Sequence, residues 1–144
     1  MYFNDFKLGM TVEIAPAVIE EEKMLAFARD YDDIPLHTDA EYAKGTPFGA
    51  LIAPGVMSFM TLWAKYLEVD FFGKELLAGK STKIEWHKPV YAQDVLHGTA
   101  EITRLVRRNA RNGLVEVSIE AYNQNNVLVL TNVTEAIVCC REEA

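Results

Sequence analysis

Two side chains that can exchange protons, Asp32 and His37, lie on either side of Pro35. Histidine titrates near neutral pH, so it can act as an acid or a base, and a neighbouring carboxylate can hold the same water molecule. Proline pushes the residue before it out of the helical region, so a preceding helix must stop near Asp32 or Asp33. The two groups can then point at one substrate atom. A helix-end aspartate beside a surface histidine is the simpler alternative.

A second chemical group is expected from the backbone after Pro54. Proline has no N–H and suits the first position of a helix, so Gly55 and Val56 would carry the first free backbone donors. N–H groups at this positive end of a helix can stabilise an oxygen atom that gains negative charge. Gly55 also lets a ligand approach the backbone closely. The alternative is that these residues simply make a good helix start.

Two helices and several strands must position these groups. The pattern predicts a first helix over Ile19 to Tyr31, and a second over Pro54 to Leu67 that is apolar on nearly every side and therefore buried. Between them, Glu41 to Phe48 is a polar, turn-rich connection. The first 18 residues are expected to lay an opening strand or extended arm on a sheet.

From Ser81 onward, β-branched and alternating residues predict an antiparallel sheet. The expected strands are Ser81 to Trp86, Val95 to Arg107, Gly113 to Gln124 and Val127 to Cys139. In the third of them, apolar residues alternate with polar ones, so one face packs and the other is wet. The dry face needs a cover, which the second helix is expected to supply, with the first helix lying outside.

Composition limits the class of protein. With 144 residues, 50% of them hydrophobic, the chain suits one domain over residues 1–144. No apolar run reaches the roughly 18 residues that span a membrane, and the first residues lack a secretion signal, so we expect a cytoplasmic protein. A net charge of -7 argues against a nucleic-acid partner. Cys139 and Cys140 are adjacent and have no metal-ligand spacing, so no metal site is expected.

Three segments, residues 27–39, 48–55 and 88–94, together resemble the MaoC-like acyl dehydratases, also called R-specific enoyl-CoA hydratases. In that family an Asp-x-Asn-Pro-x-His pattern carries the catalytic pair, which matches Asp32 and His37 here. The resemblance implies an α+β hotdog fold, in which a curved antiparallel β-sheet wraps a long buried helix. It also implies a homodimer or higher homo-oligomer.

The resemblance implies a hydro-lyase that adds or removes water across the 2,3 double bond of an acyl thioester. Asp32 and His37 would move or hold the proton, and the N–H groups of Gly55 and Val56 would bind the thioester oxygen. Coenzyme A would be part of the substrate, with no cofactor. Its anionic groups would need basic partners, for which Lys83, Lys88 and the arginines between 104 and 111 are available. Apolar residues of the second helix, among them Trp63 and Tyr66, line an acyl tunnel or are plain core.

The chain departs from the family pattern at three positions. Ile34 replaces the amide of the motif, Gln93 replaces a glycine, and Met60 stands where some hydratases carry a serine, while Ser58 faces another direction. Because Ile34 cannot hydrogen-bond the loop or a water, a non-catalytic acyl-CoA-binding module is one alternative. Thioester hydrolysis on the same fold is another.

Overall fold

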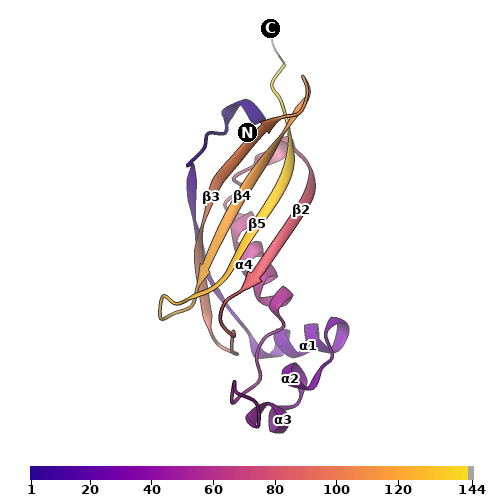
Figure 1. Cartoon of the computed structure of the whole chain (residues 1–144), viewed down its shortest axis with the longest axis vertical. Coiled ribbons are helices and arrows are strands. Elements are labelled where there is room, and N and C mark those ends of the chain that lie inside the picture. The colour runs from indigo at the N-terminus through magenta and orange to yellow at the C-terminus, as the bar shows by residue number, and fades with distance from the viewer. Residues whose placement is uncertain (143–144) are drawn as a thin grey trace.

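A five-stranded antiparallel sheet curves around one long helix in the computed structural model, which describes residues 1–142. The spatial order of the strands is β1-β3-β4-β5-β2, so β1 and β2 form the two edges (Figure 1). The strands are β1 (Thr11–Val18), β2 (Leu76–Trp86), β3 (Val95–Arg107), β4 (Asn112–Tyr122) and β5 (Leu128–Cys139). The helices are α1 (Glu21–Tyr31), α2 (Pro35–Thr38), α3 (Ala40–Lys44) and α4 (Gly55–Glu68), with short 3₁₀ turns at Phe3–Asp5 and Gly73–Glu75.

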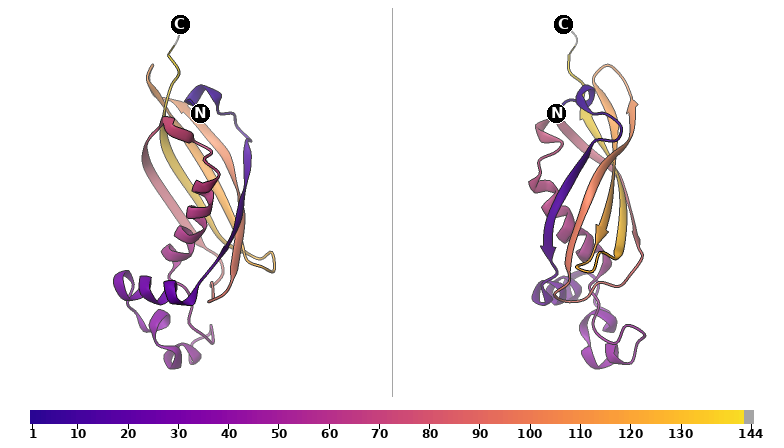
Figure 2. Two further views of the ribbon diagram at one scale, coloured as in Figure 1. Left: turned by 180° about the vertical axis from the view of Figure 1, so that it is seen from behind. Right: turned by 90° about the vertical axis from the view of Figure 1, so that its left-hand side faces the viewer.

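The sheet has one dry face, as the alternation in β4 predicts. Its inward-facing residues Val115, Val117, Ile119 and Ala121 are fully buried, whereas Glu120 on the other face is exposed. The inner faces of β3, β4 and β5 pack against α4, which lies within the curve of the sheet (Figure 2). Burial of this apolar surface is the main favourable contribution to folding.

Helix α4 is buried along one side rather than on most sides. Its buried residues are Met57, Ser58, Phe59, Leu62 and Tyr66. The opposite side exposes about half of Val56, Met60 and Leu67, residues whose spacing of four and seven forms a stripe along the helix. The expectation that α4 is buried on nearly every side is therefore wrong for the single chain. The helix also begins one residue later than expected, because Pro54 is its N-cap residue.

Helices α1, α2 and α3 lie beyond one end of the sheet and around the start of α4 (Figure 2). Helix α1 ends at Tyr31, and Pro35 then begins α2, so the predicted helix break is confirmed. Helix α3 falls in the segment expected to be a turn-rich connection. It has five residues, which are too few for a periodic apolar face. Its start is marked by Asp39, an N-cap residue whose carboxylate accepts a hydrogen bond from the Tyr42 N–H.

The edge strand β2 starts at Leu76, five residues before the start expected at Ser81. Alternation does not reveal its first half because nearly all of β2 is exposed and two irregularities interrupt its pairing with β5. The opening strand expected in the first 18 residues is confirmed as β1, which pairs with β3. No helix within residues 1–142 is both long enough and apolar enough to cross a membrane.

Shortening a core side chain of α4 should destabilise the fold strongly. Leu62 is completely buried between α4 and the sheet, so Leu62→Ala is expected to lower the free energy of unfolding by about 2–5 kcal/mol, because the removed atoms leave a cavity. Urea denaturation followed by circular dichroism measures this change. Leu8→Ala, at a leucine that is 66% exposed, is the matched control. An equal loss in both variants would contradict the assignment of Leu62 to the core.

Candidate active site

His37 is a buried side chain held by the backbone of a distant segment. It lies in α2, is 6% exposed, and its Nδ1 is 2.7 Å from the carbonyl oxygen of Ile52. A carbonyl oxygen can only accept, so Nδ1–H donates this bond. In the neutral ring Nε2 is then free of a proton and carries a lone pair. The contact with Ile52 therefore presents the second ring nitrogen of His37 as a base.

Asp32 lies next to this free nitrogen. Its Oδ2 is 3.3 Å from Nε2 of His37, and its side chain remains 43% exposed. As the C-cap residue of α1, Asp32 has left the helical conformation, which turns its carboxylate toward α2. The structure thus brings the two predicted proton-transfer groups together, with one nitrogen buried and one carboxylate open to solvent. Such a pair can hold a water molecule at their common edge.

Backbone groups organise the loop between these residues. The Ile34 N–H donates to the Asp32 carbonyl, and the Ile34 carbonyl accepts from the His37 N–H at 2.9 Å and from the Thr38 hydroxyl at 3.1 Å. The Ile34 side chain itself is 45% exposed and does not line the cleft at His37. The apolar residue in place of the motif amide therefore leaves a hydrogen-bonded loop, whose contacts come from the backbone and from Thr38.

The segment that receives His37 is fixed to the connection between β2 and β3. Ala53 N–H donates to the Val90 carbonyl at 2.7 Å, and Ile52 forms an isolated antiparallel bridge with Tyr91. The following turn includes Gln93, which has a φ of 69° at the position where the family has glycine. The left-handed conformation is thus kept with a side chain that adopts it less readily than glycine.

A cleft of about 290 Å³ joins the Asp32–His37 pair to the start of α4. It is lined by Asp32, His37, Ile52, Ala53, Gly55, Val56, Ser58, Trp86, Lys88, Pro89 and Val90. Within residues 1–142, the N–H groups of Gly55 and Val56 have no acceptor. The cleft therefore combines a base, a carboxylate and free backbone donors at the positive end of a helix.

Trp86 is a cleft residue that the sequence interpretation missed. A methyl group built at Gly55 would lie 2.6 Å from Nε1 and 2.7 Å from Cζ2 of the Trp86 indole, so the ring packs directly on the Gly55 backbone. The close approach that Gly55 allows is thus made by a side chain of β2. A large aromatic residue just before the Lys88-Pro89 motif is the signal that could have identified it.

Other polar residues near the cleft have assignable partners. Ser58 is fully buried and its hydroxyl donates to the Gly55 carbonyl at 2.7 Å, so it braces the first turn of α4. Lys88 is the one cation among the cleft residues. Lys83 pairs with Glu85 at 3.0 Å. The arginine-rich hairpin between β3 and β4 lies at the opposite end of the sheet from α1, α2 and α3 (Figure 1), so it does not reach this cleft within one chain.

Within residues 1–142, no three histidine, cysteine, aspartate or glutamate side chains cluster as metal ligands. The two cysteines are free thiols, Cys139 partly buried and Cys140 buried.

Comparisons with known proteins identify similar chains. The family model described as "MaoC like domain" matches residues 5–125. The uncharacterized protein YdeM of Bacillus subtilis (strain 168) is 25% identical over 130 residues, which cover 90% of this chain and 92% of YdeM. A MaoC-like dehydratase from Rhodospirillum rubrum has a TM-score of 0.88 with 22% identity, covering 99% of each chain.

A second similar structure has a named reaction. The HadBC complex of Mycobacterium tuberculosis, a 3R-hydroxyacyl-ACP dehydratase, matches with a TM-score of 0.76 and 27% identity, covering 90% of this chain and 96% of that one.

Proposed function

This chain belongs to the MaoC-like domain family and has the hotdog fold, and on that premise we propose that it is a hydro-lyase acting on enoyl and 3-hydroxyacyl thioesters. The observation that carries the proposal is the cleft in which His37 Nε2, the Asp32 carboxylate and the free N–H groups of Gly55 and Val56 surround one space. Addition of water to a 2,3 double bond needs a base, a proton donor and a partner for the thioester oxygen, and each is available there.

In the proposed reaction, Nε2 of neutral His37 takes a proton from a water molecule that Asp32 holds. The water oxygen bonds to C3 of the enoyl thioester, and the electron pair of the double bond moves toward the thioester carbonyl. The N–H groups of Gly55 and Val56 stabilise the negative charge on that oxygen. The His37 imidazolium then delivers its proton to C2, which restores the carbonyl and regenerates the base.

The substrate class follows from the family and from the charges around the cleft. The Mycobacterium tuberculosis relative is named for a 3R-hydroxyacyl-ACP substrate, which is an acyl thioester. We propose that the substrate of this chain is also an acyl thioester, with coenzyme A as the carrier. Lys88 is positioned to bind an anionic group of the carrier. The proposed reaction uses no cofactor and occurs in the cytoplasm.

A hydration assay tests the proposal directly. Purified protein is mixed with crotonyl-CoA and with longer and branched enoyl-CoA thioesters, and loss of the enoyl absorbance is followed together with the chirality of the product. The expected result is hydration to an R-3-hydroxyacyl-CoA. Release of free thiol would indicate a thioesterase instead, and saturable binding without turnover would indicate a non-catalytic acyl-CoA-binding module. Either result would refute the hydro-lyase.

Restoring the motif amide should change little. Ile34→Asn is expected to alter kcat/KM of hydration by less than about threefold, because the Ile34 side chain faces solvent and the loop is held by backbone bonds. Steady-state kinetics on crotonyl-CoA measure the effect. Thr38→Val, which removes a hydroxyl bonded to the Ile34 carbonyl, should cost more. An increase in rate of tenfold or more with Ile34→Asn would mean that the missing amide limits catalysis.

We also propose that the working protein is a homodimer joined through β2. This edge strand of 11 residues is exposed along nearly its whole length, and α4 beside it carries the exposed stripe Val56, Met60 and Leu67. An edge strand that pairs antiparallel with its own copy forms a closed two-fold interface, which would continue the sheet and cover this stripe.

The expected mass in light scattering after gel filtration is about twice 16.2 kDa. Met60→Glu places a charge in the stripe and should shift the protein to monomer at micromolar concentration, because the charge would lose its water on association. Lys65→Glu also places a carboxylate on α4, outside the stripe, and should leave the mass unchanged. A monomeric wild type would contradict the proposed dimer.

A further inference from the structure

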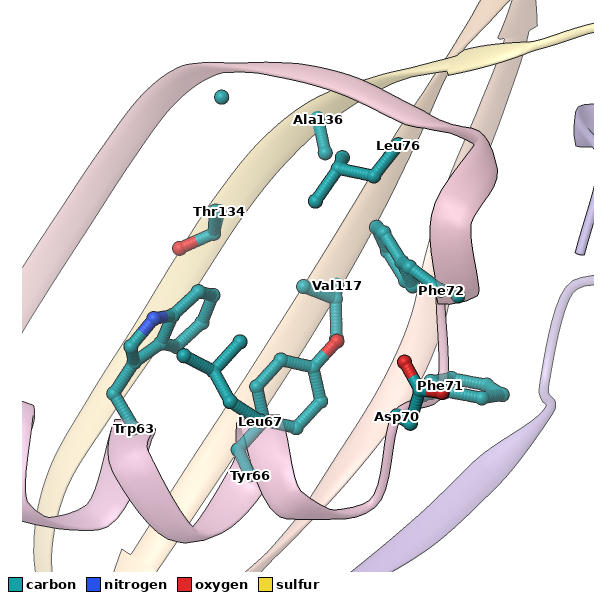
Figure 3. A pocket seen from close by; sticks show the side chains of 12 residues that line it. Trp63, Tyr66, Leu67, Asp70, Phe71, Phe72, Leu76, Val117, Thr134 and Ala136 are labelled. Atoms are coloured by element: carbon teal, nitrogen blue, oxygen red, sulfur yellow. The ribbon is translucent and has the colours of Figure 1, made fainter.

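A second cavity, of about 280 Å³, lies between the C-terminal half of α4 and the sheet (Figure 3). Its volume is almost twice the roughly 150 Å³ of an engineered apolar cavity that holds a benzene ring. The wall is mostly aromatic and aliphatic, with Trp63, Phe72, Leu76, Val117 and Ala136 among its residues. The space therefore fits an apolar group of about one ring with a short chain.

One hydroxyl in the wall of this cavity, that of Tyr66, has no hydrogen-bond partner within residues 1–142. Tyr66 is 4% exposed, and its side chain extends from α4 across the cavity toward β4 (Figure 3). Within residues 1–142 its hydroxyl makes no hydrogen bond, and burial alone raises the pKa of the Tyr66 phenol above its ordinary value. The group is therefore a neutral donor. Its oxygen is not among the fully enclosed polar atoms, so the hydroxyl is accessible from the cavity and can bond a molecule held there.

Thr134, the polar residue on the opposite wall, has no proton free to donate to the Tyr66 hydroxyl. The Thr134 hydroxyl donates to Oδ1 of Asn132 at 2.8 Å, Nδ2 of Asn132 donates to the Thr82 hydroxyl at 2.7 Å, and the Thr82 and Thr134 hydroxyls lie 2.9 Å apart. These bonds close a ring in which each hydroxyl proton has an acceptor. The ring is complete by itself, and it leaves Tyr66 as a donor that faces the cavity.

The charge of the wall restricts the ligand further. Asp70 is the one charged residue among those that line the cavity, and no cation lies there. A carboxylate or phosphate in this space would meet a like charge and lose its water without compensation. A neutral carbonyl, ether or hydroxyl oxygen can accept from Tyr66 at no such cost.

We propose that this cavity binds an uncharged, mostly apolar group that carries one oxygen atom, which accepts a hydrogen bond from the Tyr66 hydroxyl. Two sources have this chemistry. One is the far end of the acyl chain of the substrate, which rests on the proposed function; Tyr66 is 11 residues after Gly55, or about 16 Å along α4, so such a chain would be long. The other is a separate small molecule.

Binding of a matched ligand pair tests the proposal without any catalytic assay. Acetophenone carries a carbonyl oxygen, and α-methylstyrene has the same shape with a methylene group in its place. Isothermal titration calorimetry should show that Tyr66→Phe raises the Kd of acetophenone about threefold to tenfold, which is the usual contribution of a neutral hydrogen bond. The Kd of α-methylstyrene should change by less than about twofold. An equal effect on both ligands, or no binding of acetophenone to the wild type, would overturn the proposal.

Nuclear magnetic resonance locates the bound ligand. The chain has 2 tryptophans, and the indole N–H signal of Trp63 is assigned as the one missing in Trp63→Phe. Acetophenone should shift this signal and leave that of Trp86, in the other cleft, unchanged. A shift of the Trp86 signal alone would place the ligand elsewhere and overturn the proposal. Ala136→Leu, which fills the cavity from β5, should weaken the binding of both ligands.

Hydration kinetics then separate the two sources. If the oxygen belongs to the acyl chain, acetophenone should inhibit hydration of a long enoyl-CoA competitively. If it belongs to a separate molecule, the KM for the thioester should be unchanged while the Trp63 signal still shifts. Should the protein hydrate no thioester, the proposed function fails, but the difference between the two ligands still tests the cavity.

Discussion

Replacing His37 by asparagine is expected to slow hydration of crotonyl-CoA by about 10²- to 10⁴-fold, the usual contribution of a positioned proton-transfer group. Asparagine is the informative substitution because its amide nitrogen can replace Nδ1 as the donor to the Ile52 carbonyl, at 2.7 Å in the wild type, but it offers no basic nitrogen to the cleft. His37→Ala should lose activity to a similar extent and also lose that hydrogen bond.

Asp32→Asn should lower the rate by about 10²-fold or more, since the amide preserves the size of the side chain but not its charge beside Nε2. The double variant should be little slower than the slower single one, because the two groups act on the same water molecule. His87→Ala is the matched histidine control, because within residues 1–142 this exposed ring bonds only the Thr131 hydroxyl. Near-normal rates in both single variants would place proton transfer elsewhere.

The second large effect on the rate is expected from adding one methyl group at Gly55. Gly55→Ala is expected to lower kcat by about 10²- to 10³-fold, the typical cost of losing an oxyanion donor. The new methyl would overlap the Trp86 indole, so either the ring or the first turn of α4 must move. A movement of the turn displaces the N–H groups proposed to bind the thioester oxygen. Helix propensity cannot explain a loss, because alanine is the better helix former.

Trp86→Ala provides the control for this explanation. With the indole removed, the methyl group at Gly55 has room, so Gly55→Ala made in the Trp86→Ala protein should cost less than about tenfold relative to that protein. Stopped-flow or steady-state rates of the four proteins complete the cycle. If Gly55→Ala retains the wild-type rate, or if its cost is the same in both backgrounds, contact with Trp86 is not the cause.

Local rules accounted for the elements that contain the site. Pro35 predicts that the first helix stops near Asp32 or Asp33, and α1 ends at Tyr31 with Asp32 as its C-cap residue. Strand β3 has the predicted bounds of Val95 and Arg107, because alternation and flanking turns mark it clearly. The resemblance to the MaoC-like family, inferred from three short segments, is confirmed by the family model over residues 5–125.

Exposure and short length explain what the sequence interpretation missed. The first half of β2 lies at an open edge, where neither face is buried and no alternation is required. One side of α4 is exposed although its residues are apolar, since burial depends on what packs against the helix and not on its composition. The cluster of arginines, available in the sequence as a carrier site, lies at the wrong end of the sheet for the cleft.

By itself, the sequence determined where the chain leaves one helix and starts another, because proline geometry and apolar periodicity act over a few residues. Asp32, His37 and Gly55 could therefore be named as candidates in advance. Only the tertiary structure decided how they meet: the Ile52 carbonyl turns Nε2 of His37 toward Asp32, and Trp86 covers Gly55 from another strand. These contacts join residues 15 and 31 positions apart in the chain, and such pairings depend on the packing of the whole sheet around α4, which no local pattern specifies.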